Sequence, residues 1–507
     1  MATPLKLKSD NNARLVIIVC MLMLLWPALN APLALLDDHD LIVFNSGAAT
    51  KELYDGRQEN ATLPGVFKRE LEYGRCRFAY WTVKFTLVKL FGANARLHHI
   101  FQMLTGIFTA LAFFSLLRKY QVRTFNALIV VLLFACGEQA SCWYYLGPSE
   151  AFACLFFFLG WNFMNGSMRK GILAAVFFFL AGLCKETFIL TVPAVLLIDL
   201  WHREQLRMEF KSILMLNRPV LLSLFFSVAV LGVVILNKGE VYATDQPEPF
   251  LQVFISNILH VFWTSAFFIS ATFFILNGRI SRKALQLMLL SLCWVGLGLL
   301  AYYKTTLQVR YYIPAVIGPL IFLGFMLEQL SEKPGLYRMM LLPLAALLIN
   351  QSKNVLLSAN RYCTESRAYG EAIDWLAENA KDELIIYGKF PDTFEIIYST
   401  ADQLAYRNAY PKISLALSMQ RKNDNFASRL EAKLKKSFDI LYPQDLRSSP
   451  GEADISRLVF TVDDVPAAFQ WPLVKVFQET YSDISFKTLE LKKDTVKFVV
   501  LETYTGH

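Results

Sequence analysis

Residues 15–40 read LVIIVCMLMLLWPALNAPLALLDDHD. The first 22 of these residues, Leu15 to Leu36, carry no charged side chain, and a helix needs roughly 20 apolar residues to cross a bilayer. The stretch also lacks the small-residue cleavage site of a secretory signal peptide. It therefore predicts an uncleaved first transmembrane helix that ends at a cluster of acidic residues.

The composition of the whole chain is typical of a membrane protein. Its 507 residues are 55% hydrophobic and 18% charged, whereas a soluble chain usually has about 25% charged residues. These values exclude a disordered, fibrous or disulfide-stapled protein. The polar tail, residues 351–507, holds 20 Lys and Arg against 22 Asp and Glu, whereas residues 1–350 hold 30 against 20, so the basic excess belongs to the apolar part. This slightly acidic tail argues against a nucleic-acid partner.

About eleven apolar segments are candidates for membrane spans. Every second connection between them is basic, and these connections hold 17 Lys and Arg against four in the short connections on the other side. The positive-inside rule then places the N-terminus in the cytoplasm, and an odd number of spans places residues 351–507 outside. The expected spans are 15–36, 98–117, 125–143, 149–164, 171–184, 187–201, 219–237, 259–277, 284–303, 312–327 and 337–350.

The chain is expected to contain two domains, a transmembrane domain at 1–350 and a small α/β domain at 351–507. The first outer loop, 37–97, contains apolar residues at helical spacing over Phe78–Phe91, with Lys84 and Lys89 between them. This pattern predicts an amphipathic helix in the membrane interface. The basic loop either binds an anionic head group or only anchors the chain to lipid phosphates. In the tail, we expect helices at 366–380, 390–400 and 429–437 and strands at 383–387, 458–462, 488–491 and 496–501.

The acidic cluster after the first helix is a candidate catalytic site. Asp37, Asp38, His39 and Asp40 lie at the negative end of the helix dipole and need solvent, cations or a partner at a membrane boundary. A carboxylate in this position could act as general base for an acceptor hydroxyl. The cluster could also hold a divalent cation or be only a solvated cap.

Four cations are expected at the same outer membrane face. Arg75 and Arg77 precede the interfacial helix, Lys185 lies between two short spans, and Arg310 opens a late span. Converging Arg and Lys side chains recognise phosphate, so these residues could form a lipid-phosphate site. Taken singly, Lys185 could instead pair with Glu186, and Arg310 could extend its charge to the membrane surface.

Further polar residues lie at the outer ends of the spans. Glu138 and Glu150 flank a stretch that contains Tyr145, and ionisable residues at membrane depth are functional candidates. The aromatic residues beside them suit either an interfacial belt or a sugar platform. Most of the eight cysteines lie in apolar runs and none forms a CxxC pair, although a bridge between Cys76 and Cys363 is possible in an oxidising compartment.

The chain resembles the GT-C membrane glycosyltransferases, in particular the group of protein O-mannosyltransferases and aminoarabinose transferases. The resemblance covers about 15–330. It rests on five short motifs in order: Asp37-Asp38 after the first helix, Gly74-Arg-Cys-Arg77 leading to Leu90-Phe-Gly92 and His99, Tyr145-Leu-Gly-Pro-Ser-Glu150, Gly182-Leu-Cys-Lys-Glu-Thr187, and Arg310-Tyr-Tyr-Ile-Pro-Ala315. The family commonly has Asp-Glu after the first helix where this chain has Asp-Asp-His-Asp.

The resemblance implies an inverting transfer from a polyprenyl-phosphate sugar to an extracytoplasmic acceptor. Asp37 would be the base and Asp38 its neighbour or substitute, while Arg75, Arg77, Lys185 and Arg310 would hold the donor phosphate. No cofactor is implied beyond a possible divalent cation. The remaining candidates, His39, Asp40, His99, Glu138, Tyr145 and Glu150, would line the sugar and acceptor pocket.

The preferred acceptor is a bacterial cell-surface polysaccharide such as O-antigen, as in serotype-converting glucosyltransferases. The protein would then lie in the inner membrane, in contact with lipids, with its C-terminal domain in the periplasm. Protein O-glycosylation and the modification of lipid A or teichoic acid are alternatives. Two other classes also remain: a polyprenyl-lipid flippase or transporter, although no inverted repeat is evident, and a non-catalytic assembly or receptor protein.

Overall fold

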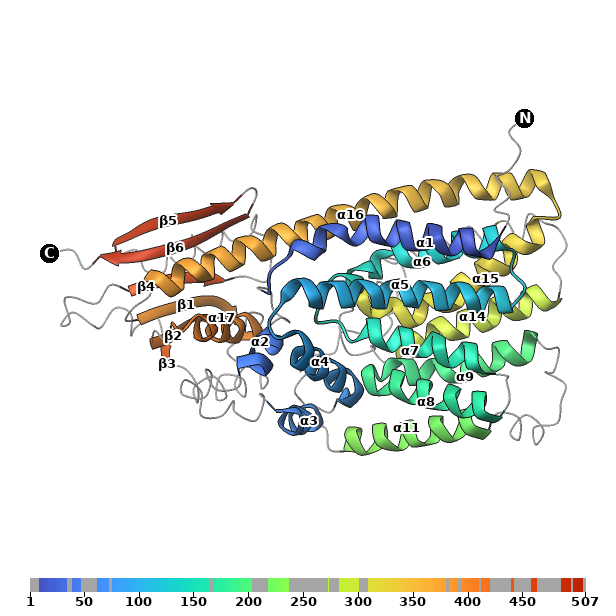
Figure 1. The fold of residues 1–507 in the computed structure, drawn as a ribbon, viewed down its shortest axis with the longest axis horizontal. Coiled ribbons are helices and arrows are strands. Elements are labelled where there is room, and N and C mark those ends of the chain that lie inside the picture. Colours follow the sequence, from blue (N-terminus) through green and yellow to red (C-terminus); the bar gives the residue numbers. More distant parts are fainter. Residues whose placement is uncertain are drawn as a thin grey trace. The chain divides into compact units, whose positions relative to one another are not determined.

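The fold is mostly helical and contains one sheet near the C-terminus (Figure 1). The computed structural model describes residues 9–33, 39–46, 62–72, 75–164, 168–202, 218–236, 272, 282–300, 309–379, 383–390, 394–409, 412–419, 439–441, 457–462, 485–493 and 496–504. The chain forms two compact units. Unit 1 contains Met1–Ala28, Glu70–Val83 and His98–Ala359, and unit 2 contains Leu29–Arg69, Lys84–Leu97 and Asn360–His507.

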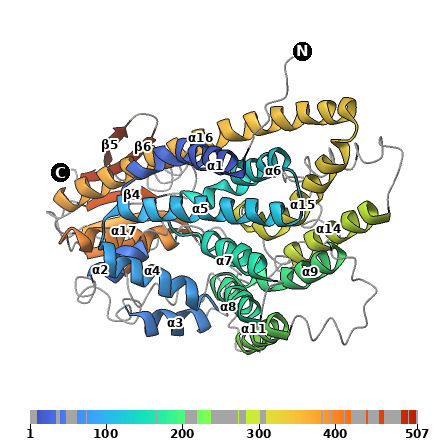
Figure 2. The same ribbon diagram turned by 45° about the vertical axis from the view of Figure 1, so that its right-hand side comes forward.

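Unit 1 is a helical bundle. Helix α8 packs on both α7 and α11, α14 packs on α9 and α15, and α15 also contacts α6 (Figure 2). Its helices are α1 (Asp10–Leu25), α5 (Ala95–Lys119), α6 (Thr124–Cys136), α7 (Glu150–Phe163), α8 (Met168–Cys184), α9 (Thr187–His202), α11 (Arg218–Leu236), α14 (Arg282–Leu300), α15 (Ile313–Leu330) and the first part of α16 (Pro334–Asn379), with the 3-10 helices η4 (Glu138–Trp143) and η5 (Val309–Tyr312).

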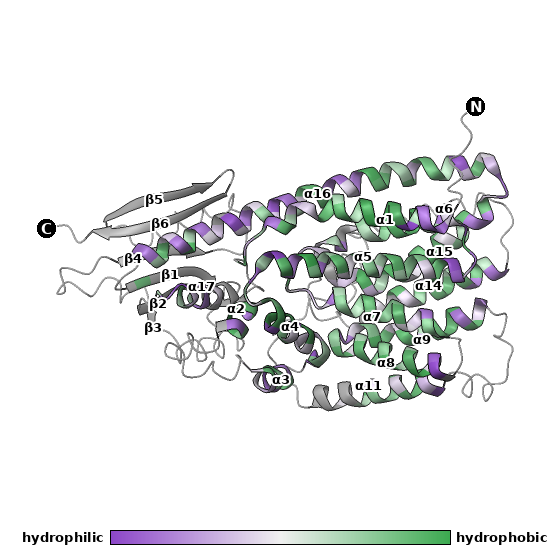
Figure 3. Cartoon of the chain, viewed as in Figure 1, coloured by the Kyte–Doolittle hydropathy of each residue, from purple (hydrophilic) through white to green (hydrophobic). Residues whose placement is uncertain are grey.

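Several bundle helices are suited to cross a membrane (Figure 3). Four described helical stretches are long and apolar enough: α1 with the 3-10 helix η1 (Trp26–Asn30), α5, α15 and α16. Shorter apolar helices, such as α6, α7 and α9, complete the described bundle. Each expected span has a described helix except 259–277, which lies almost entirely outside the described residues. The count of eleven spans stays a prediction.

Small residues allow α14 and α15 to approach closely. A Cβ atom added to Gly298 would lie 2.8 Å from the Cα atom of Ala315, and one added to Gly318 would lie 2.8 Å from the Cβ atom of Trp294. The same contact is closed by two side-chain hydrogen bonds to backbone oxygens, from Trp294 to Pro314 at 2.5 Å and from Ser291 to Gly318 at 3.0 Å. Small residues and such polar contacts are what hold helices together in lipid.

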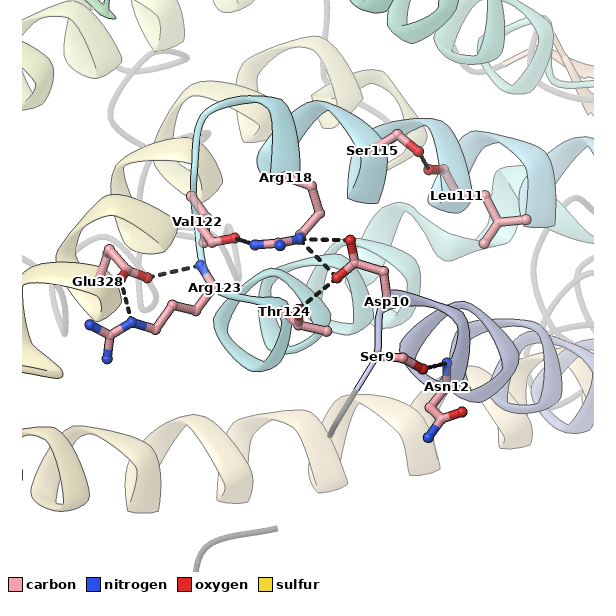
Figure 4. A network of polar contacts seen from close by, with 10 residues as sticks. All are labelled: Ser9, Asp10, Asn12, Leu111, Ser115, Arg118, Val122, Arg123, Thr124 and Glu328. Atoms are coloured by element: carbon pink, nitrogen blue, oxygen red, sulfur yellow. Dashed lines mark hydrogen bonds and ion pairs between the residues drawn. The ribbon is translucent and has the colours of Figure 1, made fainter. Parts of the chain in front are cut away.

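Two carboxylates join helix ends at the connection between α5 and α6 (Figure 4). Asp10, in the first turn of α1, pairs with Arg118 at 2.9 Å and accepts a hydrogen bond from Thr124 at 2.6 Å. Glu328, in α15, pairs with Nε of Arg123 at 2.7 Å and accepts the backbone N–H of the same residue at 2.9 Å. These contacts fix the ends of α1, α5, α6 and α15 relative to one another.

Unit 2 contains a six-stranded mixed sheet. The strand order is β3-β2-β1-β4-β6-β5; the first four strands are parallel neighbours, β6 runs antiparallel to β4, and β5 pairs with β6. Helix α17 (Phe394–Tyr406) contacts β1 and α2 (His39–Ser46). The strands are β1 (Glu383–Phe390), β2 (Lys412–Met419), β3 (Asp439–Leu441), β4 (Arg457–Val462), β5 (Ser485–Lys493) and β6 (Val496–Tyr504).

The helices around the outer loop and the tail follow the sequence pattern in part. Helix α4 (Phe78–Phe91) covers the stretch that was expected to be helical, and it is preceded by α3 (Leu63–Glu72). Helix α16 runs without a break from Pro334 to Asn379, so the helices expected at 337–350 and 366–380 are one element. The two units divide within it, between Ala359 and Asn360. The helix expected at 429–437 lies outside the described residues.

Candidate functional site

The candidate site is a cluster of charged side chains at three helix ends of unit 1. A two-residue break separates α8 from α9 and contains Lys185 and Glu186. The backbone N–H of Lys185 still bonds to Ala181 at 2.9 Å, and the carbonyls of Lys185 and Glu186 accept the first hydrogen bonds of α9. The cationic Lys185 and the anionic Glu186 are thus fixed next to each other between two helices. The start of α7, the segment before α4 and the 3-10 helix η5 supply the other members of the cluster.

Glu186 holds the segment that precedes α4. One of its carboxylate oxygens accepts the backbone N–H of Cys76 at 2.9 Å, across 110 residues of sequence. Burial opposes ionisation of Glu186, but the Arg77 guanidinium, the Lys185 ammonium and this N–H outweigh it and lower the pKa of the carboxyl. Glu186 is therefore a carboxylate at neutral pH and fixes the backbone between Arg75 and Arg77.

Lys185 forms a buried ion pair with Glu150, the first residue of α7. Its ammonium nitrogen lies 2.8 Å from a Glu150 oxygen, and only 4% of the lysine side chain and 2% of the glutamate side chain are exposed. The ammonium also lies 4.2 Å from the centre of the Tyr311 ring in η5, a cation–π contact. Burial and the nearby Arg77 charge lower the pKa of Lys185 below its ordinary value.

Arg77 is the second cation of the cluster. Burial disfavours its charge, but the carboxylates of Glu186, Glu70 and Glu150 outweigh that effect and raise the pKa of Arg77. Its Nε atom is buried and has no hydrogen-bond partner among the described residues, and the same holds for one carboxylate oxygen of Glu70. The buried Nε atom of Arg77 and the buried oxygen of Glu70 thus keep hydrogen-bonding capacity for a ligand.

Tyr80 anchors α4 to the loop before α7. Its hydroxyl donates to the carbonyl of Gly147 at 2.5 Å, and its ring lies 6.2 Å from that of Phe152 in α7. In the same loop Tyr145 packs against Tyr144 at 5.1 Å. These contacts keep the start of α7, and therefore Glu150, next to the α4 segment.

The structure brings together part of the predicted phosphate site. Arg77 and Lys185 belong to one cluster, as expected, but the carboxylate that pairs with Lys185 is Glu150, not the adjacent Glu186. Arg75 is half-buried beside them, and its backbone N–H bonds to the carbonyl of Glu70 at 2.8 Å. Arg310 lies in η5, next to Tyr311, but its side chain is outside the described part.

The other predicted residues have different surroundings. His99 is buried in α5, and Asp40, in unit 2, pairs with Arg69 at 3.4 Å. Glu138 begins η4, which packs against η5. The described residues do not include Asp37 and Asp38, nor the side chains of His39 and Glu138, so the predicted base stays a prediction.

Metal and thiol chemistry gain no support in the described part of the chain. No group of three or more His, Cys, Asp or Glu side chains there could hold a metal ion. All eight cysteines are free thiols in the structure. Cys76 belongs to unit 1 and Cys363 to unit 2, and a bridge between them stays an alternative from the sequence. Burial, with the charges of Glu186 and Glu70, raises the pKa of Cys76 to about 12, which keeps this thiol protonated and a poor nucleophile.

Sequence reasoning missed three members of the cluster. Glu186 was noticed only as a neighbour of Lys185, Tyr311 only as part of a motif, and Glu70 not at all. Glu70 stands in the charged run Lys68-Arg-Glu-Leu-Glu72, where charge is typical of a solvated helix face. The available signal was its position five residues before Arg75, at the end of the amphipathic helix α3.

Comparison with known proteins agrees with this architecture. No protein-family model and no curated protein matches the chain. Among solved structures, the crystal structure of ArnT from Cupriavidus metallidurans bound to undecaprenyl phosphate aligns with a TM-score of 0.53, over 96% of this chain and 97% of that chain. The fold resembles that of ArnT. At 12% sequence identity the likeness extends to the fold alone, and the expected mostly helical fold is confirmed at that level.

Proposed function

We propose that the chain is a membrane glycosyltransferase that moves a sugar from a polyprenyl-phosphate donor to an acceptor outside the cytoplasm. The observation that carries the proposal is a pair of cations, the buried Lys185 and Arg77 with its buried Nε atom, at helix ends of a bundle whose fold resembles ArnT. Buried cations are costly unless they are paired or bind an anion. The structure with that fold was solved with undecaprenyl phosphate, a lipid that carries such an anion.

The donor phosphate is proposed to bind Arg77 and Lys185, with Arg75 and Arg310 completing its coordination. A guanidinium can donate two parallel hydrogen bonds to phosphate oxygens, and an ammonium adds a point charge. Both stabilise the negative charge that develops on the phosphate as the bond to the sugar breaks. The orphaned Nε of Arg77 is one donor available for this purpose.

The acceptor is proposed to be activated by a carboxylate of the acidic cluster, Asp37 with Asp38 as neighbour or substitute. The base takes the hydroxyl proton, the acceptor oxygen attacks the anomeric carbon, and the lipid phosphate leaves from the opposite face, which inverts the anomeric centre. His39, Asp40, His99, Glu138, Tyr145 and Glu150 are the proposed lining of the sugar and acceptor pocket.

The proposed setting is the inner membrane of a bacterium, with a cell-surface polysaccharide such as O-antigen as acceptor. The N-terminus would lie in the cytoplasm and residues 351–507 in the periplasm. A phosphatase reporter fused after His507 should be active, because this enzyme folds only outside the cytoplasm. A reporter that is active only in the cytoplasm would overturn this topology.

The transferase proposal is tested by following sugar from a labelled donor. Purified protein in vesicles receives undecaprenyl-phosphate hexoses and lipopolysaccharide, and both the labelled acceptor and the released undecaprenyl phosphate are measured. The variants Arg77→Gln and Lys185→Gln should each lose transfer, whereas Glu328→Gln, a carboxylate at another helix end, should retain it. If lipid-linked sugar changes membrane side without being cleaved, the chain is a transporter and the proposal fails.

A further inference from the structure

The cations of the cluster are opposed by carboxylates of the same cluster. Two cations, Arg77 and Lys185, face three carboxylates, those of Glu70, Glu150 and Glu186. Glu150 takes the contact that an anionic ligand of Lys185 would need, at 2.8 Å from the ammonium nitrogen. A lipid phosphate that used Lys185 would therefore have to displace a buried carboxylate.

Glu150 is better placed than Glu186 to leave its cation. Glu186 is held by the backbone N–H of Cys76, and its departure would release the segment before α4. Glu150 lies in the first turn of α7, where the positive end of the helix dipole stabilises a carboxylate even without Lys185. Its charge also acts on Arg77, so the displaced carboxylate stays near a second cation.

The proposed reaction makes the lipid phosphate more negative, and a carboxylate that competes for the cations opposes the tighter binding that would result. The donor is a phosphodiester with one negative charge. When the bond between the anomeric carbon and the phosphate oxygen breaks, the electron pair stays on that oxygen, and the acceptor proton goes to the base. The product is a phosphate monoester with roughly 1.5–2 negative charges at pH 7. Without an opposing carboxylate, the product would bind the cations more tightly than the donor does.

We propose that Glu150 and the lipid phosphate compete for Lys185, so that Glu150 is an internal counter-ion which yields to the donor and returns to expel the product. The proposal rests on the transferase function proposed above. It assigns Glu150 a positioning role through Lys185 and makes product release, rather than donor binding alone, depend on this carboxylate.

The test measures the affinity of purified protein in nanodiscs for undecaprenyl phosphate, with undecaprenol as the control for the lipid chain. Glu150→Gln removes the competing charge and keeps the shape of the side chain. It should bind undecaprenyl phosphate at least about tenfold more tightly, because the phosphate no longer has to displace a carboxylate from the Lys185 ammonium. Steady-state turnover should fall as the product accumulates on the protein, and a burst of released product in the first turnover should precede that fall.

Two further variants keep the test decisive. Glu150→Asp retains the charge but shortens the reach to Lys185, so its affinity should rise about threefold, even if the glutamine variant fails to fold. In a Lys185→Gln background the substitution Glu150→Gln should change the affinity less than about threefold, because no ammonium remains to be contested. Glu328→Gln, which removes a carboxylate from the Arg123 pair, should leave the affinity unchanged.

The outcomes separate this inference from the function on which it rests. Binding of undecaprenyl phosphate that is stronger than that of undecaprenol, and that tightens in both Glu150 variants, supports the exchange. Equal or weaker binding by both variants overturns the exchange but leaves the transferase proposal intact. If the parent protein binds undecaprenyl phosphate no better than undecaprenol, both proposals are overturned.

Discussion

Replacing Glu186 with glutamine should weaken both the fold and the use of donor. The amide oxygen of Gln can still accept the Cys76 N–H, which now bonds to the carboxylate at 2.9 Å. The negative charge that balances Arg77 and Lys185 is lost. The variant therefore isolates the charge of Glu186 from its shape and from its hydrogen-bonding capacity.

The size of the effect follows from two contributions. A hydrogen bond to a charged group contributes about 1.5–3 kcal/mol and one between neutral groups about 0.5–1.5 kcal/mol, so the Cys76 contact should lose about 1–2 kcal/mol. Losing the charge that Arg77 and Lys185 attract should add about 1 kcal/mol, because Glu186 is half-buried and exposure to solvent weakens such interactions. We expect a total loss of about 2–3 kcal/mol and an apparent Tm lower by several degrees.

Glu328→Gln is the matched control. Glu328 also accepts a backbone N–H at 2.9 Å, that of Arg123, and pairs with the same arginine at 2.7 Å (Figure 4). Both variants should lower the Tm, measured by thermal unfolding in detergent, but only Glu186→Gln should raise the KM for the polyprenyl-phosphate donor. If the two variants change the donor KM to the same extent, Glu186 has no special role in positioning the cations and the reasoning is refuted.

Three further predictions concern chemistry, pH and packing. Binding of undecaprenyl phosphate should be lost with rising pH before the ordinary lysine pKa of about 10.4 is reached, because the pKa of Lys185 is lowered. Lys185→Arg should still bind undecaprenyl phosphate at the pH at which the parent protein no longer does. Identical pH profiles of the two proteins would contradict this prediction. Asp37→Asn or Asp38→Asn, whichever removes the base, should lower the transfer rate ~10²–10⁴-fold and leave donor binding unchanged. Parental rates in both variants would exclude the proposed base. If chelator abolishes the activity of the parent protein and a divalent cation restores it, the acidic cluster has a metal role. Gly298→Val should destabilise the bundle by about 1–3 kcal/mol, because its Cβ would lie 2.8 Å from the Cα atom of Ala315; an unchanged Tm would show that α14 and α15 can separate at no cost.

The sequence predicted what depends on local pattern. Apolar residues at helical spacing predicted the helix over Phe78–Phe91, and α4 has these bounds. The short break at Lys185 and Glu186 was expected because apolar runs stop on both sides of it. The sequence pattern predicted two helices in place of α16, because the hydropathy of the chain changes after residue 350. Nothing in the sequence at that point breaks a helix, and α16 continues to Asn379.

The partners of the charged residues could not be predicted in the same way. Lys185 has an acidic neighbour in sequence, yet it pairs with Glu150 at the start of another helix. Glu186 instead reaches the backbone of Cys76, 110 residues earlier. Both interactions depend on how α7, α8 and α9 pack together, and the local sequence pattern carries no information on that packing.

A density map of the protein with bound undecaprenyl phosphate tests the central claim most directly. We predict that the phosphate oxygens lie about 2.7–2.9 Å from nitrogen atoms of Arg77 and Lys185, the spacing of charge-assisted hydrogen bonds, with Glu150 no longer in contact with the ammonium. A phosphate bound elsewhere, with the ion pair of Lys185 and Glu150 intact, would contradict the account.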